Sequence, residues 1–328
     1  MTVYTRIGMG LGNQMFQYAA GLALSTVLGR DLVVDLAMFG GEGSYGGDTP
    51  RKYELKDVFG IEARQASRDE HLSFSYSQPV RRAWNKVYYR RNPLLQGLPY
   101  EQPLAVTQTY RIFNRLSPAH RQATYYEPHY HYDRHFTAAS EDPVYLIGHW
   151  QSWRYSNEIL DQLRQTFCVR PELTGAVTDL GSAMRSTDSV SLHIRMTDRT
   201  SKDHYKKLFG GLGAGYYEAA INHLKRTHSD LRLYLFSDEP DAARDLLPSS
   251  LDATVVSGDI TSSSAEDLHL MMQCRHNVIA NSSFSWWAAH LNGSEGHTVI
   301  APSDWYATRR YNTRDLYPPS WTTIPNHF

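Results

Sequence analysis

Short apolar runs alternate with amphipathic stretches along this chain, most regularly in its second half. Short apolar runs predict buried strands, and apolar residues that recur every three or four positions predict helices. In chain order, the second half is predicted to contain strands at 188–193, 231–236, 253–256, 277–280 and 298–301, and helices at 216–226, 240–247, 265–274 and 283–291. Strands and helices that alternate in this way predict an α/β fold, with a parallel sheet covered by helices on both faces.

The chain begins with one more unit of this kind. Residues 3–7 and 32–35 are predicted to be strands, and 15–28 a helix that ends at Gly29. The turn at 8–14 is rich in glycine, which lets backbone N–H groups approach a ligand closely. Its G-x-G-x-G spacing differs from the G-x-G-x-x-G of dinucleotide-binding folds, so a dehydrogenase stays only an alternative.

A length of 328 residues favours two domains over one. Residues 40–140 have the least regular pattern and are predicted to be an irregular insertion. A buried strand at 144–147 resumes the α/β pattern beyond it. We therefore predict an N-terminal domain at 1–155, which contains the insertion, and a C-terminal domain at 175–328.

The composition excludes several classes of protein. The net charge of -1 argues against a nucleic-acid-binding protein, and two cysteines, Cys168 and Cys274, indicate a reducing compartment. No apolar run approaches the roughly 20 residues of a membrane span, and no signal-peptide pattern follows Met1. We therefore expect a cytoplasmic protein.

One local charge cluster departs from this neutral balance. Within residues 81–91, basic residues interleave with tryptophan and tyrosine. An amphipathic helix with a solvated basic face is the favoured interpretation. The alternative is peripheral contact with the anionic inner face of the plasma membrane, because aromatic and basic residues both favour that interface.

Polar side chains gather where two predicted strands end. His193, Arg195 and Asp198 follow the strand at 188–193, and the Arg195 fork suits a phosphate or carboxylate. A surface ion pair between Arg195 and Asp198 is the alternative. Residues 281–283, Asn-Ser-Ser, start a helix whose free N–H groups favour phosphate, although they also suit a simple helix cap. Two anion sites on one sheet edge favour a diphosphate ligand.

A third strand end carries residue types that are common in sugar pockets. The strand at 144–147 leads into His149, Trp150 and Gln151. An aromatic platform and a side-chain amide can bind a sugar ring and its hydroxyls. A core strand capped by a tryptophan explains the same residues equally well.

These motifs together resemble the family 11 glycosyltransferases, the α-1,2-fucosyltransferases. The resemblance rests on residues 10–19 (GLGNQMFQYA), on His193-x-Arg195-x-x-Asp198, on Phe236-Ser237-Asp238, on residues 281–289 (NSSFSWWAA) and on a G-x-W-Q-S-x-x-Y-like segment at 148–155. It spans most of the chain and leaves 40–140 largely unmatched.

The resemblance implies a two-lobed GT-B-type glycosyltransferase with Rossmann-like parallel sheets, which acts in carbohydrate biosynthesis such as that of O-antigen. It implies inverting transfer of L-fucose from GDP-β-L-fucose to O2 of a terminal galactose on a glycan. Membrane contact through residues 81–91 would mean that the acceptor glycan is lipid-linked. We expect no cofactor and no metal, because the chain lacks the D-x-D motif of metal-dependent transferases. The residues assigned to the GDP-fucose donor are Gly12, Asn13, Gln14, His193, Arg195, Asp238, Glu266, Asp267, Asn281, Ser282, Ser283 and Phe284. Those assigned to the acceptor side are His149, Trp150 and Gln151.

The catalytic assignments are Arg195, Asp198 and Asp203. Arg195 is expected to stabilise the leaving GDP. Asp198 is preferred as the base or as the residue that orients Arg195, with Asp203 second and His149 third. Met196 departs from many family members, which have a second arginine there. This departure keeps open a homologue that binds GDP-sugars without turnover, and transfer to another acceptor or position is a further alternative.

Overall fold

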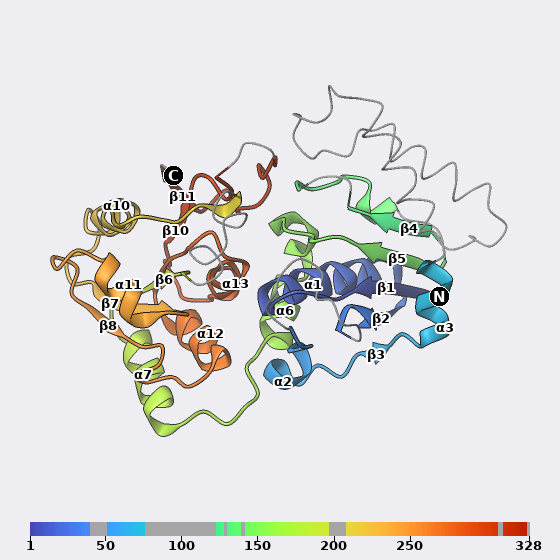
Figure 1. Cartoon of the computed structure of the whole chain (residues 1–328), viewed down its shortest axis with the longest axis horizontal. Coiled ribbons are helices and arrows are strands. Elements are labelled where there is room, and N and C mark those ends of the chain that lie inside the picture. Colours follow the sequence, from blue (N-terminus) through green and yellow to red (C-terminus); the bar gives the residue numbers. More distant parts are fainter. Residues whose placement is uncertain are drawn as a thin grey trace. The chain divides into compact units, whose positions relative to one another are not determined.

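The computed structural model describes residues 1–39, 51–75, 123–127, 130–138, 142–196, 208–307 and 311–326. The chain forms two compact units, each built on one parallel sheet (Figure 1). Unit 1 comprises Met1–Lys56, Ile61–Leu160 and Arg309–Tyr317, and unit 2 comprises Asp57–Gly60, Asp161–Thr308 and Pro318–Phe328. Residues 57–60 thus belong to unit 2 and residues 309–317 to unit 1, whereas the predicted domains, 1–155 and 175–328, are two continuous ranges.

The sheet of unit 1 has the strand order β3-β2-β1-β5-β4, and all of its strand pairs are parallel. The strands are β1 (Thr2–Arg6), β2 (Asp31–Asp35), β3 (Arg64–Gln65), β4 (Ala123–Tyr126) and β5 (Val144–Ile147). In chain order, the described helices up to residue 166 are α1 (Leu11–Leu28), α2 (Leu55–Phe59), α3 (Arg68–Ser75) and α6 (Leu160–Thr166). The 3-10 turns in the same part of the chain are Ala37–Phe39, Phe136–Ala138, Trp153–Tyr155 and Asn157–Ile159. The strands β3 and β4 lie within 40–140, where the apolar pattern predicts none.

Both faces of this sheet are apolar because successive strand residues point to opposite sides and the buried residues on each side are mostly apolar. One face carries Val3, Val144 and Leu146 in a cluster with residues of α1, which lies along β1 (Figure 1). The other face carries Tyr4 and Tyr145, whose rings meet edge to face with centroids 6.5 Å apart. Full burial of an aliphatic side chain such as that of Val144 or Leu146 stabilises the fold by about 1.5–3 kcal/mol.

Helix α1 begins at Leu11, four residues earlier than predicted. Gly10 takes an extended conformation (φ -79°, ψ 167°) as the N-cap residue, and burial of Leu11 to 5% exposure holds the first turn against the unit. Residues 12–14 therefore belong to the first turn of the helix and not to a glycine-rich loop. The predicted end is confirmed, since Gly29 has the left-handed conformation (φ 61°) that glycine adopts without strain.

The sheet of unit 2 has the strand order β11-β10-β9-β6-β7-β8, again with parallel pairs throughout. Its strands are β6 (Ser189–Ile194), β7 (Arg232–Ser237), β8 (Ala253–Val255), β9 (His276–Val278), β10 (Val299–Pro302) and β11 (Thr322–Ile324). Its helices are α7 (Gly175–Arg185), α10 (Ala214–Leu224), α11 (Pro240–Leu246), α12 (Ser264–Gln273) and α13 (Ser283–Leu291). The strand at 298–301 was expected to be the last, but β11 follows it at the sheet edge.

Helices cover both faces of this second sheet. Val190 and Leu192 of β6 point into an apolar cluster with α10. On the opposite face, the Asn277 side chain donates to Ser191 Oγ (2.7 Å) and to the Met271 carbonyl of α12 (2.9 Å). The predicted α/β class, with two Rossmann-like parallel sheets, is confirmed.

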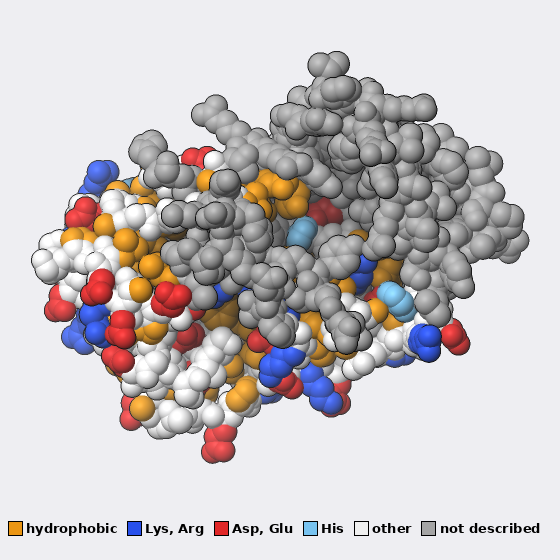
Figure 2. All heavy atoms as spheres, viewed as in Figure 1, with side chains coloured by type: hydrophobic (Ala, Val, Ile, Leu, Met, Phe, Trp, Pro, Cys, Tyr) orange, Lys and Arg blue, Asp and Glu red, His pale blue; other side chains and the backbone are white. Residues whose placement is uncertain are grey.

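The described surface carries no large single-signed patch on the face in Figure 2, where acidic and basic side chains intermingle. Among the described residues, every helix falls short of the length and apolarity needed to cross a membrane. The stretch at 81–91 lies outside the described residues, so the membrane-contact hypothesis stays a prediction.

Candidate functional site

The strand order of unit 2 reverses between β6 and β9. Counted from β6 as the first strand, the order from β8 to β11 is 3-2-1-4-5-6, the arrangement that binds ligands at the carboxyl ends of its strands where the order reverses. His193 and Arg195 stand at the end of β6, and residues 281–284 follow β9. The structure therefore places these predicted donor residues at the switch point.

The Asp238 carboxylate holds the end of β6 in place. Its Oδ2 lies 3.0 Å from Arg195 Nη1, and its Oδ1 accepts the Met196 N–H at 2.8 Å. Both partners of the ion pair are half-buried, with side chains 26% and 18% exposed. The contact exists because Ile194 pairs with Ser237, so the residues that follow β6 and β7 are neighbours. Asp238 was expected to bind the donor; the structure shows its contacts with Arg195 and Met196, and its role toward the donor stays a prediction.

His193 lies against the start of α13. Its ring and that of Phe284 have centroids 5.8 Å apart, tilted by 49°. The His193 carbonyl accepts the Tyr217 hydroxyl at 3.1 Å, which fixes the strand end. Two residues that the sequence assigned to one site are therefore in contact.

The start of α13 offers backbone donors. The Ser282 side chain at the N-cap position makes no capping hydrogen bond. The first helical N–H groups, at 283–285, have no acceptor within the described parts of the chain, as helix geometry dictates. Such a helix start favours an anionic ligand.

Asn281 supports this helix start from below. Its side-chain nitrogen donates to the carbonyls of Phe209 (2.9 Å) and Trp305 (3.0 Å), which uses both amide hydrogens. The residue is 1% exposed. Its amide hydrogens therefore anchor the start of α13 to unit 2.

Glu266 and Asp267, at the start of α12, form hydrogen bonds with other residues of unit 2. Asp267 accepts the hydroxyls of Thr261 (2.5 Å) and Ser257 (2.8 Å), and burial raises its pKa to about 6. Glu266 Oε2 accepts the Ser262 N–H at 2.6 Å. These contacts hold the loop between β8 and α12, and the predicted donor-binding role of Glu266 stays a prediction.

In unit 1, the first turn of α1 carries two different side chains. Gln14 is fully buried; its amide donates to the carbonyls of Met9 and Lys52 (2.9 Å each) and accepts the Glu54 N–H (2.9 Å). No amide hydrogen of Gln14 is left for a donor molecule, so its side chain ties the loop to residues 52–54. Gly12, beside it, is buried in the same turn.

Asn13 and Gln151 meet although they lie far apart in the sequence. Gln151 Nε2 donates to Asn13 Oδ1 at 2.7 Å. Asn13 was predicted to bind the GDP-fucose, and Gln151 was predicted to bind the acceptor glycan. The contact joins these two residues at the carboxyl edge of the first sheet. His149 stacks on Tyr130 with ring centroids 5.7 Å apart, and burial lowers its pKa.

Trp150 is not the sugar platform that the sequence predicted. It is 0% exposed and lies in the apolar core, with its ring 5.4 Å from that of Phe136 and 5.2 Å from that of Tyr155. Its backbone has a left-handed φ of 58°, a conformation that is uncommon for residues other than glycine. The alternative, a tryptophan that caps a core strand, is correct.

Glu127 belongs to this edge, and the sequence pattern did not single it out. It follows β4, and its Oε2 accepts the N–H groups of His149 (2.6 Å) and Trp150 (3.0 Å). Burial raises its pKa to about 7, against the lowering effect of these two hydrogen bonds. The sequence gives little indication of this role, because β4 was not predicted and Glu127 belongs to no recognisable motif.

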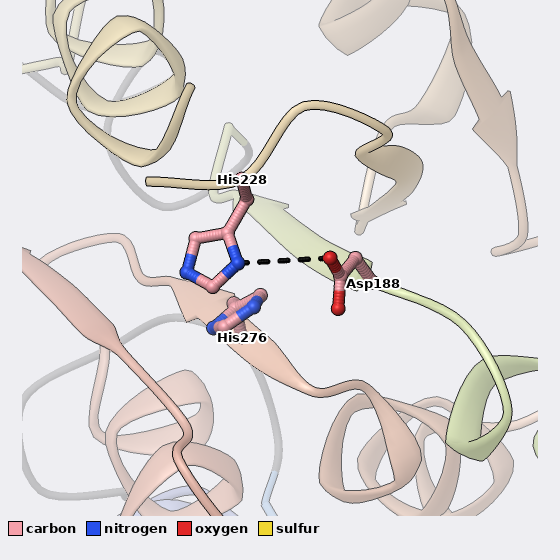
Figure 3. Close-up of side chains that lie close together, drawn as sticks. All are labelled: Asp188, His228 and His276. Carbon is pink, nitrogen blue, oxygen red and sulfur yellow. Dashed lines mark ion pairs between the residues drawn. The ribbon is translucent and has the colours of Figure 1, made fainter. Parts of the chain in front are cut away.

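A second cluster lies at the amino ends of β6 and β9, where Asp188, His228 and His276 hold potential metal-ligand atoms within 4.8 Å of one another (Figure 3). Arg275 already lies 2.8 Å from the Asp188 carboxylate, and His228 lies 3.6 Å from it. His276 Nδ1 accepts the Thr298 N–H at 3.1 Å, so the neutral ring carries its proton on Nε2. These contacts favour an internal polar cluster over a metal site.

The remaining predicted residues, Asp198 and Asp203, lie outside the described residues, so their roles stay predictions. The other assigned residues divide between the two units. Unit 1 holds Gly12–Gln14 and 149–151, and unit 2 holds the rest.

Residues 107–325, more than half of the chain, match the model of the family described as Glycosyl transferase family 11. An alpha-1,2-colitosyltransferase of Escherichia coli is 28% identical over 326 residues, which cover 98% of this chain and 98% of that protein. The O-antigen biosynthesis glycosyltransferase WbnK of Escherichia coli is 29% identical over 329 residues, 98% of this chain and 100% of that protein. The galactoside 2-alpha-L-fucosyltransferase Sec1 of Mus musculus is 26% identical over 193 residues, 55% of this chain and 51% of that protein.

Proposed function

This chain belongs to glycosyl transferase family 11, and from that premise we propose that it transfers L-fucose from GDP-β-L-fucose to O2 of a terminal galactose. The product is an α-1,2-fucoside, formed with inversion and without a metal ion. One observation carries the proposal: Arg195, held by Asp238, stands at the switch point where His193 contacts the start of α13. That arrangement suits the diphosphate of a nucleotide sugar.

The chemistry follows from charge. The galactose O2 attacks the anomeric carbon of fucose, and the bond from that carbon to the β-phosphate oxygen breaks. Negative charge then grows on the leaving GDP. The Arg195 fork and the N–H groups at the start of α13 are donors suited to that charge, and donors fixed in advance stabilise it without reorganisation. The sequence holds no D-x-D motif, so these groups take the place of a bound cation in the proposal.

For the transferred sugar, a specific alternative to fucose exists. The bacterial relative named as an alpha-1,2-colitosyltransferase aligns over 98% of this chain, whereas the relative named as a 2-alpha-L-fucosyltransferase aligns over 55%. Both names carry a 1,2 or 2-position linkage. Transfer of colitose with the same linkage is therefore the second candidate function, and an O-antigen glycan is the acceptor class we favour.

A direct test incubates the purified protein with GDP-fucose and a β-galactoside, and measures released GDP together with the glycan product. We expect GDP release that depends on the acceptor, and NMR of the product should show fucose on O2 of galactose. GDP-linked colitose in a parallel reaction compares the two donors. Binding of GDP-sugars without acceptor-dependent GDP release, across a panel of galactosides, would establish the homologue without turnover instead.

A further inference from the structure

Glu127 stands where two strands of the first sheet end side by side. Tyr126 of β4 pairs with Ile147 of β5, and the Glu127 N–H donates to the Ile147 carbonyl at 2.9 Å. The strands are parallel, so Glu127 and His149 leave the sheet at the same carboxyl edge. This is the edge at which open α/β sheets bind their ligands.

The two carboxylate oxygens of Glu127 have different surroundings. Oε2 accepts the N–H groups of both His149 and Trp150, which fixes the orientation of the carboxylate. Oε1 has no hydrogen-bond partner among the residues described, and the side chain is only half-buried. One oxygen therefore serves the fold, and the other is left for a group from outside.

The chain makes room for this carboxylate at Gly148. A Cβ atom at that position would lie 2.5 Å from Glu127 Cβ and 2.7 Å from Oε2, closer than real Cβ atoms approach. Glycine at 148 is therefore required for the observed position of Glu127. Next to it, the Gln151–Asn13 hydrogen bond and the stacked His149 and Tyr130 rings supply polar and aromatic groups.

We propose that Glu127, in place of Asp198, Asp203 or His149, is the catalytic base, which takes the proton from the attacking hydroxyl of the acceptor sugar. The inference rests on the proposed function. As the acceptor oxygen bonds to the anomeric carbon, the carbon–phosphate-oxygen bond breaks and GDP leaves with the electron pair. The hydroxyl proton moves to Glu127 Oε1, and the carboxyl later releases it to solvent.

The titration behaviour of Glu127 agrees with this role. Burial raises its pKa to about 7, so the carboxyl gives up its proton close to neutral pH and is a stronger base than an exposed glutamate. The neighbouring titratable groups are His149, whose pKa burial and Arg6 lower, and Tyr155, whose pKa burial and Glu127 raise. Both are neutral at pH 7, so Glu127 is the group among them whose charge changes there. Turnover should rise with pH through about 7.

Two substitutions separate a base from a purely structural anchor. Glu127→Gln keeps an oxygen that accepts both backbone N–H groups but cannot take a proton. Glu127→Ala removes the anchor as well. We expect Glu127→Gln to bind GDP as the wild type does, to lose roughly 10²–10⁴-fold in kcat, and to lose the rise of kcat near pH 7.

Glu70→Gln is the matched control, because it removes one carboxylate of the same unit whose pKa is lowered to about 2 by Arg64 and Tyr4. That variant should keep the rise near pH 7. A Glu127→Gln enzyme with near-normal kcat and an unchanged pH profile, beside an unstable Glu127→Ala variant, would show that the carboxylate only anchors the turn. A wild-type protein that binds GDP-sugars but transfers nothing would overturn the proposed function, and the base with it.

Discussion

Replacing Asp238 by asparagine tests whether the arginine at the switch point must be held in one orientation. In the protein, Oδ1 accepts the Met196 N–H and Oδ2 pairs with Arg195 Nη1 at 3.0 Å. An asparagine keeps one oxygen for the Met196 N–H, but its amide hydrogens then face the guanidinium. The ion pair is lost while the backbone contact survives.

The expected magnitude follows from what Arg195 does and how exposed the pair is. Removal of Arg195 altogether should cost roughly 2–4 kcal/mol of transition-state stabilisation, the range seen for oxyanion-hole donors. Arg195→Lys should not restore activity, because a point charge does not reproduce the planar fork. The half-buried pair with Asp238 lies between surface and buried ion pairs, so its loss should cost about 1–2 kcal/mol, or roughly 5–30-fold in kcat.

The assay is a double-mutant cycle on GDP release at saturating donor and acceptor. If Asp238 acts only through Arg195, Asp238→Asn should slow the wild type but leave Arg195→Ala no slower than before. Asp188→Asn is the matched control, since Asp188 pairs with Arg275 at 2.8 Å at the opposite end of the same sheet. Additive losses in the cycle would refute the positioning role and return Asp238 to direct contact with the donor.

Further outcomes are expected from metal removal, from the basic stretch and from acid. Activity should survive exhaustive EDTA treatment, and loss that Mg²⁺ or Mn²⁺ reverses would refute the metal-independent mechanism. If the basic stretch contacts membranes, a fourfold glutamine variant should bind anionic vesicles less while it still turns over a soluble acceptor; its positions are Arg81, Arg82, Arg90 and Arg91. Burial among tryptophan rings lowers the pKa of His290 to about 3, so the ring stabilises the fold above pH 6.5 and that contribution is lost as pH falls toward 3. Denaturant titrations of His290→Phe should therefore show a loss of stability on acidification that is smaller by about 1.4 kcal/mol per pH unit than in the wild type; equal slopes would contradict this.

The second half of the chain could be predicted well because its signals are local. Strands such as 189–194 and helices such as 283–291 follow from residues within a few positions of one another. Parallel strands bring their carboxyl ends to one edge, so the positions of Arg195 and Ser283 relative to the sheet also follow from the sequence.

Tertiary structure decided which of the candidate side chains are buried or already hydrogen-bonded within the protein. Tryptophan serves equally well in a sugar pocket and in a core, and only the tertiary structure shows that Trp150 is buried beside Phe136 and Tyr155. Two of the three hydrogen bonds of the Gln14 amide go to backbone groups 38 and 40 residues away, a separation that no local sequence pattern reports. Asp238 lies beside Arg195 because the register of β6 against β7 aligns Ile194 with Ser237.

Glu127 shows the same limit most clearly. The strand before it, β4, has four residues and follows a long stretch without a regular apolar pattern, so the sequence alone did not mark the carboxylate. Its position depends on the pairing of β4 with β5 and on the absence of a side chain at Gly148. Local periodicity predicted most of the strands and helices of the second half, and with them the strand ends that carry Arg195 and Ser283. Long-range pairing and packing decided the environments of its carboxylates and amides, because those depend on partners that lie far away in the chain.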